Sequence, residues 1–193
     1  MIDYIIGKVD RLSPTTLVLE CGGIGYEIGI TLIDYGELKD KESTKIYIHE
    51  SIREDAHQLF GFLDLDTREY FRMLIGVSGV GPNTARLILS SLNNEQLESA
   101  ISTGNTTALR AVKGIGGKTA ERIIVDLKDK IKRAGKTLSS SMVSSEETFK
   151  DALAALVMLG FSQQPSQKVL QKIFLAEPQA SAEQAIKMAL KML

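Results

Sequence analysis

The chain has 193 residues, of which 44% are hydrophobic, so it is long enough for a core and for one to three domains. The sequence contains no run of eighteen apolar residues, and a start that carries Asp3 does not resemble a signal peptide, so we expect a cytoplasmic protein without a membrane segment. A single cysteine, Cys21, excludes an internal disulfide, and together with His49 and His57 it gives no metal-ligand spacing. We therefore expect neither a metal nor another cofactor.

Charge is unevenly distributed, although the net charge is only −1. Residues 1–63 carry six basic and eleven acidic residues, whereas residues 64–136 carry twelve basic and eight acidic ones. Residues 137–193 carry five of each. A basic middle segment favours a polyanionic partner, but ordinary solvated helix faces give the same charge count.

Residues 1–63 have the pattern of a small β domain. Short apolar or alternating runs, typical of strands, occur at 4–12, 15–22, 25–32, 44–52 and 57–63. The stretch LIDYGELKDK, which precedes the fourth run, has helical character. Five short strands with a helix before the fourth predict a closed barrel of the OB-fold type.

From residue 64 onward the pattern is helical. Apolar residues recur three or four positions apart at 66–77, 82–92, 94–103, 106–112 and 117–134. Asn94 and Thr106 are expected to cap two of these helices. Taken together, residues 64–136 are expected to form an all-α domain. The serine-rich residues 137–145 predict a flexible linker, and residues 146–193 predict a compact three-helix domain.

The segment GIGGKT, residues 114–119, ends like the P-loop of an ATPase. The full P-loop pattern needs a glycine at position 112, where this chain has Val112, and a buried strand before the loop. The preceding residues 106–112 instead have helical spacing. The sequence therefore disfavours ATP hydrolysis and requires another explanation for the loop.

That explanation is an internal repeat. A shift of 35 residues places LIGVSGVGPNTARLILSSL (74–92) on LRAVKGIGGKTAERIIVDL (109–127), with Gly79/Gly114, Gly81/Gly116, Thr84/Thr119 and Ala85/Ala120 among the identical pairs. The shared unit is a helix, a Gly-apolar-Gly turn and a second helix. It is similar to the helix-hairpin-helix motif, here present twice.

Each shared residue suits the binding of a phosphate. The first glycine permits a positive φ, and the second lets a phosphate approach the free N–H groups and the positive dipole end of the following helix. Such contacts read no base, so binding is expected to be independent of sequence. A purely structural helical hairpin is the alternative. The candidate DNA-binding residues are Gly79, Gly81, Asn83, Thr84, Gly114, Gly116, Gly117, Lys118, Thr119 and Arg122.

The whole chain resembles the RuvA family of Holliday-junction-binding proteins over nearly its full length. The marks of the resemblance are IREDAHQLFGF (52–62), GVGPNTA (79–85), KGIGGKTAERIIVDLKDK (113–130) and LVMLGFS (156–162). The family implies a homotetramer, one or two of which hold a four-way junction open and nearly square. It also implies a C-terminal domain that engages the hexameric ATPase RuvB, and joint work with the nuclease RuvC. The chain itself is then expected to be non-catalytic.

The resemblance also assigns residues. The family's acidic pin at the junction centre falls on Glu54 and Asp55, which could otherwise be ordinary turn residues. In residues 146–193, the candidates for the partner surface are Leu156, Leu159 and Leu190, with core packing as the alternative.

The two Gly-apolar-Gly turns and the helix starts that follow them are called the phosphate loops below. The chain departs from some relatives at these loops. Asn83 and Gly117 stand where those relatives carry lysine, which leaves Lys118 as the loop lysine. Lys113, Arg86 and Arg122 are candidates to compensate, and Arg122 is preferred because it lies next to the second loop.

Two other classes of protein remain as alternatives. A helix-hairpin-helix glycosylase or nuclease would need a catalytic residue after a single hairpin or a carboxylate cluster for two metals, and neither is evident. An interaction module similar to ubiquitin-associated domains describes residues 146–193 alone.

Overall fold

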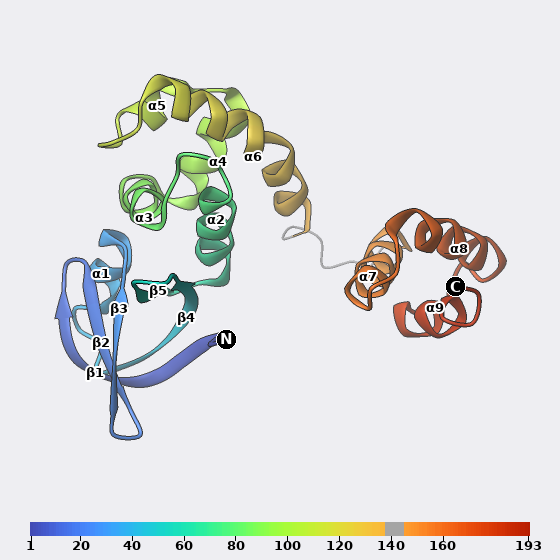
Figure 1. Ribbon diagram of the computed structural model, residues 1–193, viewed down its shortest axis with the longest axis horizontal. Helices are drawn as coiled ribbons and strands as arrows, with labels where there is room; N and C mark the ends of the chain where they lie inside the picture. Colours follow the sequence, from blue (N-terminus) through green and yellow to red (C-terminus); the bar gives the residue numbers. More distant parts are fainter. Residues whose placement is uncertain (138–144) are drawn as a thin grey trace. The chain divides into compact units, whose positions relative to one another are not determined.

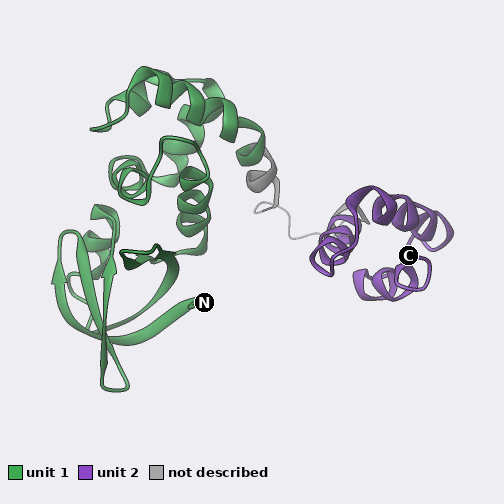
Figure 2. Ribbon diagram, viewed as in Figure 1, with its two compact units in different colours: residues 1–135 green, residues 136–193 purple. Residues whose placement is uncertain are grey.

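The computed structural model of the chain describes residues 1–137 and 145–193 (Figure 1). The chain divides into two compact units, Met1–Gly135 and Lys136–Leu193 (Figure 2). Most of the predicted linker, residues 138–144, lies outside the described residues. The domain boundaries proposed from the sequence stay predictions.

The first unit begins with a closed barrel, as predicted. Its strands are β1 (Tyr4–Ser13), β2 (Thr16–Cys21), β3 (Ile24–Gly29), β4 (Ser43–Ile52) and β5 (His57–Phe62). They close in the order β1-β2-β3-β5-β4, and the pairing of β3 with β5 is parallel whereas the other pairings are antiparallel. Helix α1 (Leu32–Leu38) stands between β3 and β4. Fully buried side chains fill the barrel, including Leu17, Leu19, Ile28, Ile46 and Ile48.

The barrel interior leaves no room for a side chain at Gly61 of β5. A Cβ there would lie 2.6 Å from Cγ2 of Ile28 and 2.7 Å from Cδ1 of Ile46. We therefore expect Gly61→Ala to lower the free energy of unfolding by about 1–3 kcal/mol, the usual cost of overpacking a core. Thermal and urea unfolding of the full chain measure this change.

The control for this prediction is Gly25→Ala on β3. Its Cβ would lie 3.5 Å from Cγ1 of Val18, which is an ordinary van der Waals distance. The free energy of unfolding should then change by about 0.5 kcal/mol or less. Equal destabilisation by both alanines would show that Gly61 is not a packing constraint.

Five helices follow the barrel: α2 (Leu65–Ile75), α3 (Pro82–Ser91), α4 (Asn94–Thr103), α5 (Thr106–Arg110) and α6 (Gly117–Thr137), whose last two residues lie past the end of the first unit. Their apolar faces share one core with the end of β5. Phe71 of α2 joins the two parts, because its ring centroid lies 5.2 Å from that of Phe60 and 4.9 Å from that of Phe62. The helices therefore pack on the barrel through aromatic side chains.

The two caps predicted for this region, Asn94 and Thr106, are each one residue too late. The side chain of Asn93 accepts a hydrogen bond from the N–H of Gln96, and the side-chain oxygen of Gln96 accepts one from the N–H of Asn93. Asn105 caps α5 in the same way, without the reciprocal bond. The Asn-x-x-Gln spacing of a capping box was present in the sequence and marks position 93.

The second unit contains α7 (Ser145–Met158), α8 (Gln163–Ala176) and α9 (Ala182–Ala189). This confirms the predicted C-terminal helical domain. Its core is formed by Ala152, Leu156, Leu170, Ile173, Ala185 and Ala189. Among the described residues of the whole chain, no helix is both long and apolar enough to cross a membrane.

Candidate nucleic-acid interface

The two copies of the internal repeat have the same backbone geometry at their glycine turns. Gly79 has a φ of 92° and Gly114 a φ of 91°, the left-handed region that favours glycine. The next residues, Val80 and Ile115, are 4% and 6% exposed and belong to the same core. Each turn therefore places an apolar side chain between its two helices, as the sequence predicts.

The second glycine of each turn begins a helix. Gly81 is the N-cap of α3, with φ −86° and ψ 171°, and its carbonyl accepts the N–H of Ala85 at 2.9 Å. The Gly116 carbonyl accepts the N–H of Ala120 at the same distance. A Cβ on either glycine would meet no described atom within 4 Å. The fold therefore tolerates a side chain there, and its absence leaves the helix start open to an approaching group.

The first turns of α3 and α6 present unneutralised positive ends. No side chain among the described residues caps α3, and neither first turn contains an acid. By contrast, the first turns of α2 and α4 carry Asp66 and Glu95. Free N–H groups and an exposed dipole end form a binding site for an anion such as phosphate.

The two loops are not equivalent as donors. Helix α3 starts with Pro82, which has no N–H, whereas α6 starts with Gly117, whose N–H is available. The second loop also carries Lys118, which is exposed, where the first has Asn83. We therefore expect the second loop to bind an anion more strongly than the first.

We expect Lys118→Ala to weaken DNA binding and to lower the salt dependence of the affinity. Each lost phosphate contact should reduce the slope of log affinity against log salt by up to about one unit. Asn83→Ala is the matched control at the equivalent position of the first loop, and it should leave the slope unchanged. Binding titrations at several salt concentrations measure both slopes, and an unchanged slope for Lys118→Ala would remove this lysine from the interface.

The glycine loop of GIGGKT follows helix α5 and not a strand, so it lacks the context of a P-loop. Among the cations considered for the loops, Arg122 and Lys113 are exposed. Arg86 is not free, because its Nη1 donates to the carbonyl of Thr15 at 2.9 Å. This bond uses one of the five guanidinium N–H donors, so the idea that Arg86 compensates for a missing loop lysine stays a prediction.

Glu54 and Asp55 lie at the tip of the hairpin between β4 and β5, and both are exposed. A turn hydrogen bond from the N–H of Arg53 to the carbonyl of Ala56, 2.8 Å long, closes the tip. Both acids thus occupy the turn between β4 and β5, and their role as a pin at a junction centre stays a prediction.

The stem of this hairpin is tied to the start of the chain. The carboxylate of Glu50 accepts the N–H of Ile2 at 2.9 Å, and this hydrogen bond lowers the pKa of Glu50. Its other oxygen lies 3.6 Å from Nε2 of His57 on the paired strand. Glu50 thus braces the strands that carry the acidic tip.

In the second unit, one of the three residues proposed to contact a partner is buried. Leu156 is 0% exposed and lies in the core beside Ala152, so the prediction is wrong for this residue. Leu159 and Leu190 are 60% and 45% exposed, and their role stays a prediction.

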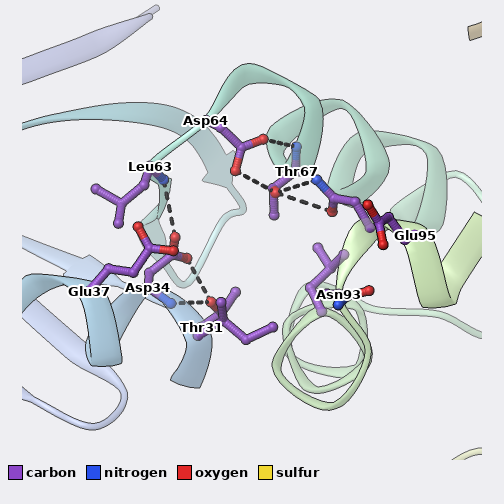
Figure 3. A pocket seen from close by; sticks show the side chains of 11 residues that line it. Thr31, Asp34, Glu37, Leu63, Asp64, Thr67, Asn93 and Glu95 are labelled. Atoms are coloured by element: carbon purple, nitrogen blue, oxygen red, sulfur yellow. Dashed lines mark hydrogen bonds between the residues drawn. The ribbon is translucent and has the colours of Figure 1, made fainter. Parts of the chain in front are cut away.

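A cavity of about 440 Å³ lies in the first unit between α1 and the starts of α2 and α4 (Figure 3). Two of the acids that line it have structural partners: Asp64 accepts the N–H of Thr67 at 2.7 Å, and Asp34 accepts the hydroxyl of Thr31 at 2.6 Å. Burial raises the pKa of Asp34. Within the described residues, no group of three or more His, Cys, Asp or Glu side chains could hold a metal ion.

A five-stranded barrel followed by two phosphate-loop hairpins defines a class of barrel and tandem helix-hairpin-helix proteins. Residues 1–61 match the RuvA N terminal domain, residues 71–129 the SAM-like helix-hairpin-helix tandem, and residues 148–193 the RuvA C-terminal domain. The chain belongs to the RuvA family, as its sequence motifs indicate.

Several relatives match over the full length of both chains. The chain is 50% identical to the Holliday junction branch migration complex subunit RuvA of Bacteroides thetaiotaomicron and 53% identical to that of Parabacteroides distasonis. It is 42% identical to the protein of the same name from Porphyromonas gingivalis. In each case the match covers 100% of this chain and 100% of the relative.

Proposed function

We propose that this chain is a non-catalytic scaffold that binds four-way DNA junctions independently of their sequence. In this proposal it holds the junction open and square and recruits a RuvB-type ATPase, which drives branch migration during recombination and repair. The relatives' shared name, a subunit of a Holliday junction branch migration complex, supports this assignment.

The observation that carries the proposal is the pair of open helix starts at Gly81 and Gly116. Both offer backbone N–H groups and a positive dipole end, which suit phosphate and carry no information about the base sequence. Contacts of this kind bind the sugar–phosphate backbone, so affinity depends on the shape and charge of the DNA.

Selectivity for a junction requires several copies of these loops around one centre. We propose a homotetramer that contacts all four arms through its loops, with Glu54 and Asp55 of each subunit near the crossover. One or two tetramers then cover a junction, and a RuvC-type nuclease acts on the same complex. No ATP hydrolysis is assigned to the chain itself.

A gel-shift comparison tests this function. Two four-way junctions of unrelated sequence should bind equally well, and both should bind more tightly than duplexes made from the same arms. The purified chain should show no ATPase activity with either DNA. Equal affinity for junction and duplex would contradict the proposal, as would ATP hydrolysis by the chain alone.

The second unit should be dispensable for binding and necessary for migration. A chain ending near residue 136 retains both phosphate loops, so its junction affinity should stay within about threefold of the full chain, because the phosphate contacts that dominate affinity are kept. It should fail to support ATP-driven branch migration with RuvB. A migration assay with RuvB checks this, and migration at the full-length rate would show that residues 146–193 do not recruit the ATPase.

A further inference from the structure

The two repeats differ in how they are attached to the barrel. In the first repeat, Nη1 of Arg86 on α3 donates to the carbonyl of Thr15 in the turn between β1 and β2, at 2.9 Å. That carbonyl also accepts the N–H of Ile30 at 3.1 Å, so it is itself fixed within the barrel. Burial of the guanidinium lowers the pKa of Arg86. Helix α3 is thus hydrogen-bonded to the barrel by a partly buried cation.

A second attachment lies one turn further along α3. The N–H of Leu32, at the start of α1, donates to Oγ of Ser90 at 3.1 Å. The same hydroxyl donates to the carbonyl of Arg86 at 2.8 Å. Arg86 is therefore held at its side chain by the β1–β2 turn and at its backbone by a serine that also contacts α1.

Space for the guanidinium is provided by Gly29 at the end of β3. A Cβ at this position would lie 2.9 Å from Nη1 of Arg86. Its other near neighbours, Phe60 and Leu59, would be at 3.5 and 3.6 Å, which are ordinary contact distances. A methyl group on Gly29 therefore disturbs the arginine before it disturbs the barrel.

The second repeat lacks this attachment. At the shift of 35 residues, Arg86 corresponds to Glu121 and Ser90 to Val125. Both of these residues are exposed, and Val125 retains 75% of its accessible surface. The repeats share the residues that build the phosphate loop and differ at the residues that join one of them to the barrel.

We propose that Arg86 is a positioning residue, which fixes the first phosphate loop relative to the barrel and its acidic hairpin. We call the hydrogen bond from Arg86 to the carbonyl of Thr15 the joint. Helix α3 connects the joint to the first loop, because Arg86 follows Gly81 by five residues, or about 7.5 Å of helix. A helix this short is stiff, so a change at the joint reorients the N–H groups of the loop.

The joint matters for one kind of DNA more than for another, and this step rests on the proposed function. A straight duplex meets the loops and can follow a small change in their direction. A junction meets the loops and the barrel hairpins at once, so it requires their relative position to be fixed. Loss of the joint should therefore weaken junction binding and leave duplex binding almost unchanged.

The test compares Arg86→Ala, Gly29→Ala and the double variant in the full chain. Arg86→Ala and Gly29→Ala should each lower the ratio of junction to duplex affinity by about tenfold or more, the factor expected for one hydrogen bond with a charged donor. Because both changes act on the same contact, the double variant should be no worse than Arg86→Ala alone. The salt slope should stay at the parent value in all three.

Arg122→Ala is the contrasting control, because a lost phosphate contact should lower affinity for junction and duplex alike and reduce the salt slope. The same behaviour from Arg86→Ala would make Arg86 a phosphate contact and overturn the inference. An unchanged affinity ratio in both single variants would also overturn it. If Arg86→Ala does not fold, Gly29→Ala carries the test without loss of charge. A parent chain without junction preference would overturn the proposed function, and the inference with it.

Discussion

Replacing Gly81 and Gly116 together with valine is expected to abolish DNA binding while leaving the fold intact. A Cβ at either position would meet no described atom within 4 Å, and neither glycine has a positive φ. The valine side chain would occupy the space through which a phosphate reaches the helix N–H groups. Loss of charge-assisted hydrogen bonds at both loops should weaken binding to junction and duplex alike by at least about 100-fold.

The matched controls are the first glycines of the same turns. Gly79 and Gly114 have positive φ, so valine there strains the backbone and should cost about 1–3 kcal/mol of stability at each site. Thermal unfolding together with DNA titration separates the two effects. Unchanged binding by a folded Gly81→Val/Gly116→Val chain would mean that the hairpins are structural and do not contact DNA.

Neutralising the hairpin tip should have the opposite effect on duplex binding. The change of Glu54 to Gln with Asp55 to Asn removes negative charge without removing a phosphate contact. In a tetramer up to eight such charges surround the crossover, and charges a few Å apart repel by about 1 kcal/mol even in water. Duplex affinity should therefore rise by about fivefold or more, and the preference for a junction should narrow.

The effect should shrink in high salt, because exposed charges are screened beyond roughly 8 Å at physiological ionic strength. The measurement is the ratio of junction to duplex affinity for the parent and the double variant at two salt concentrations. Gln58→Ala, on the strand that follows the tip, is a control that alters the hairpin without changing its charge. An unchanged ratio in a folded tetramer would make Glu54 and Asp55 ordinary turn residues.

Local signals in the sequence were sufficient for the barrel, the helices and the two Gly-apolar-Gly turns. Glycine is the residue that adopts a φ near 90° without strain, so the paired glycines at 79 and 114 identify the turns directly. The repeat then fixes which helix follows each turn. These features depend on residues close in the chain, and the sequence contains that information.

Long-range contacts were not predictable in the same way. Helical spacing places Leu156 and Leu159 on one helix, but α7 ends at Met158, so Leu156 packs in the core and Leu159 lies exposed in the turn that follows. Arg86 looks like a cation beside a phosphate loop, and its bond to Thr15 spans 71 residues of sequence. The sequence contains one signal of this contact: the second repeat has Glu121 at the position that corresponds to Arg86.

The mass of the complex tests most directly whether several chains assemble around one junction. Light scattering or native mass spectrometry should show a tetramer of the free chain, and four or eight chains on one four-way junction. This number should stay constant when the junction arms are lengthened, because the centre determines the assembly. A single chain on a junction would contradict the account, as would a number of chains that grows with arm length as on plain duplex.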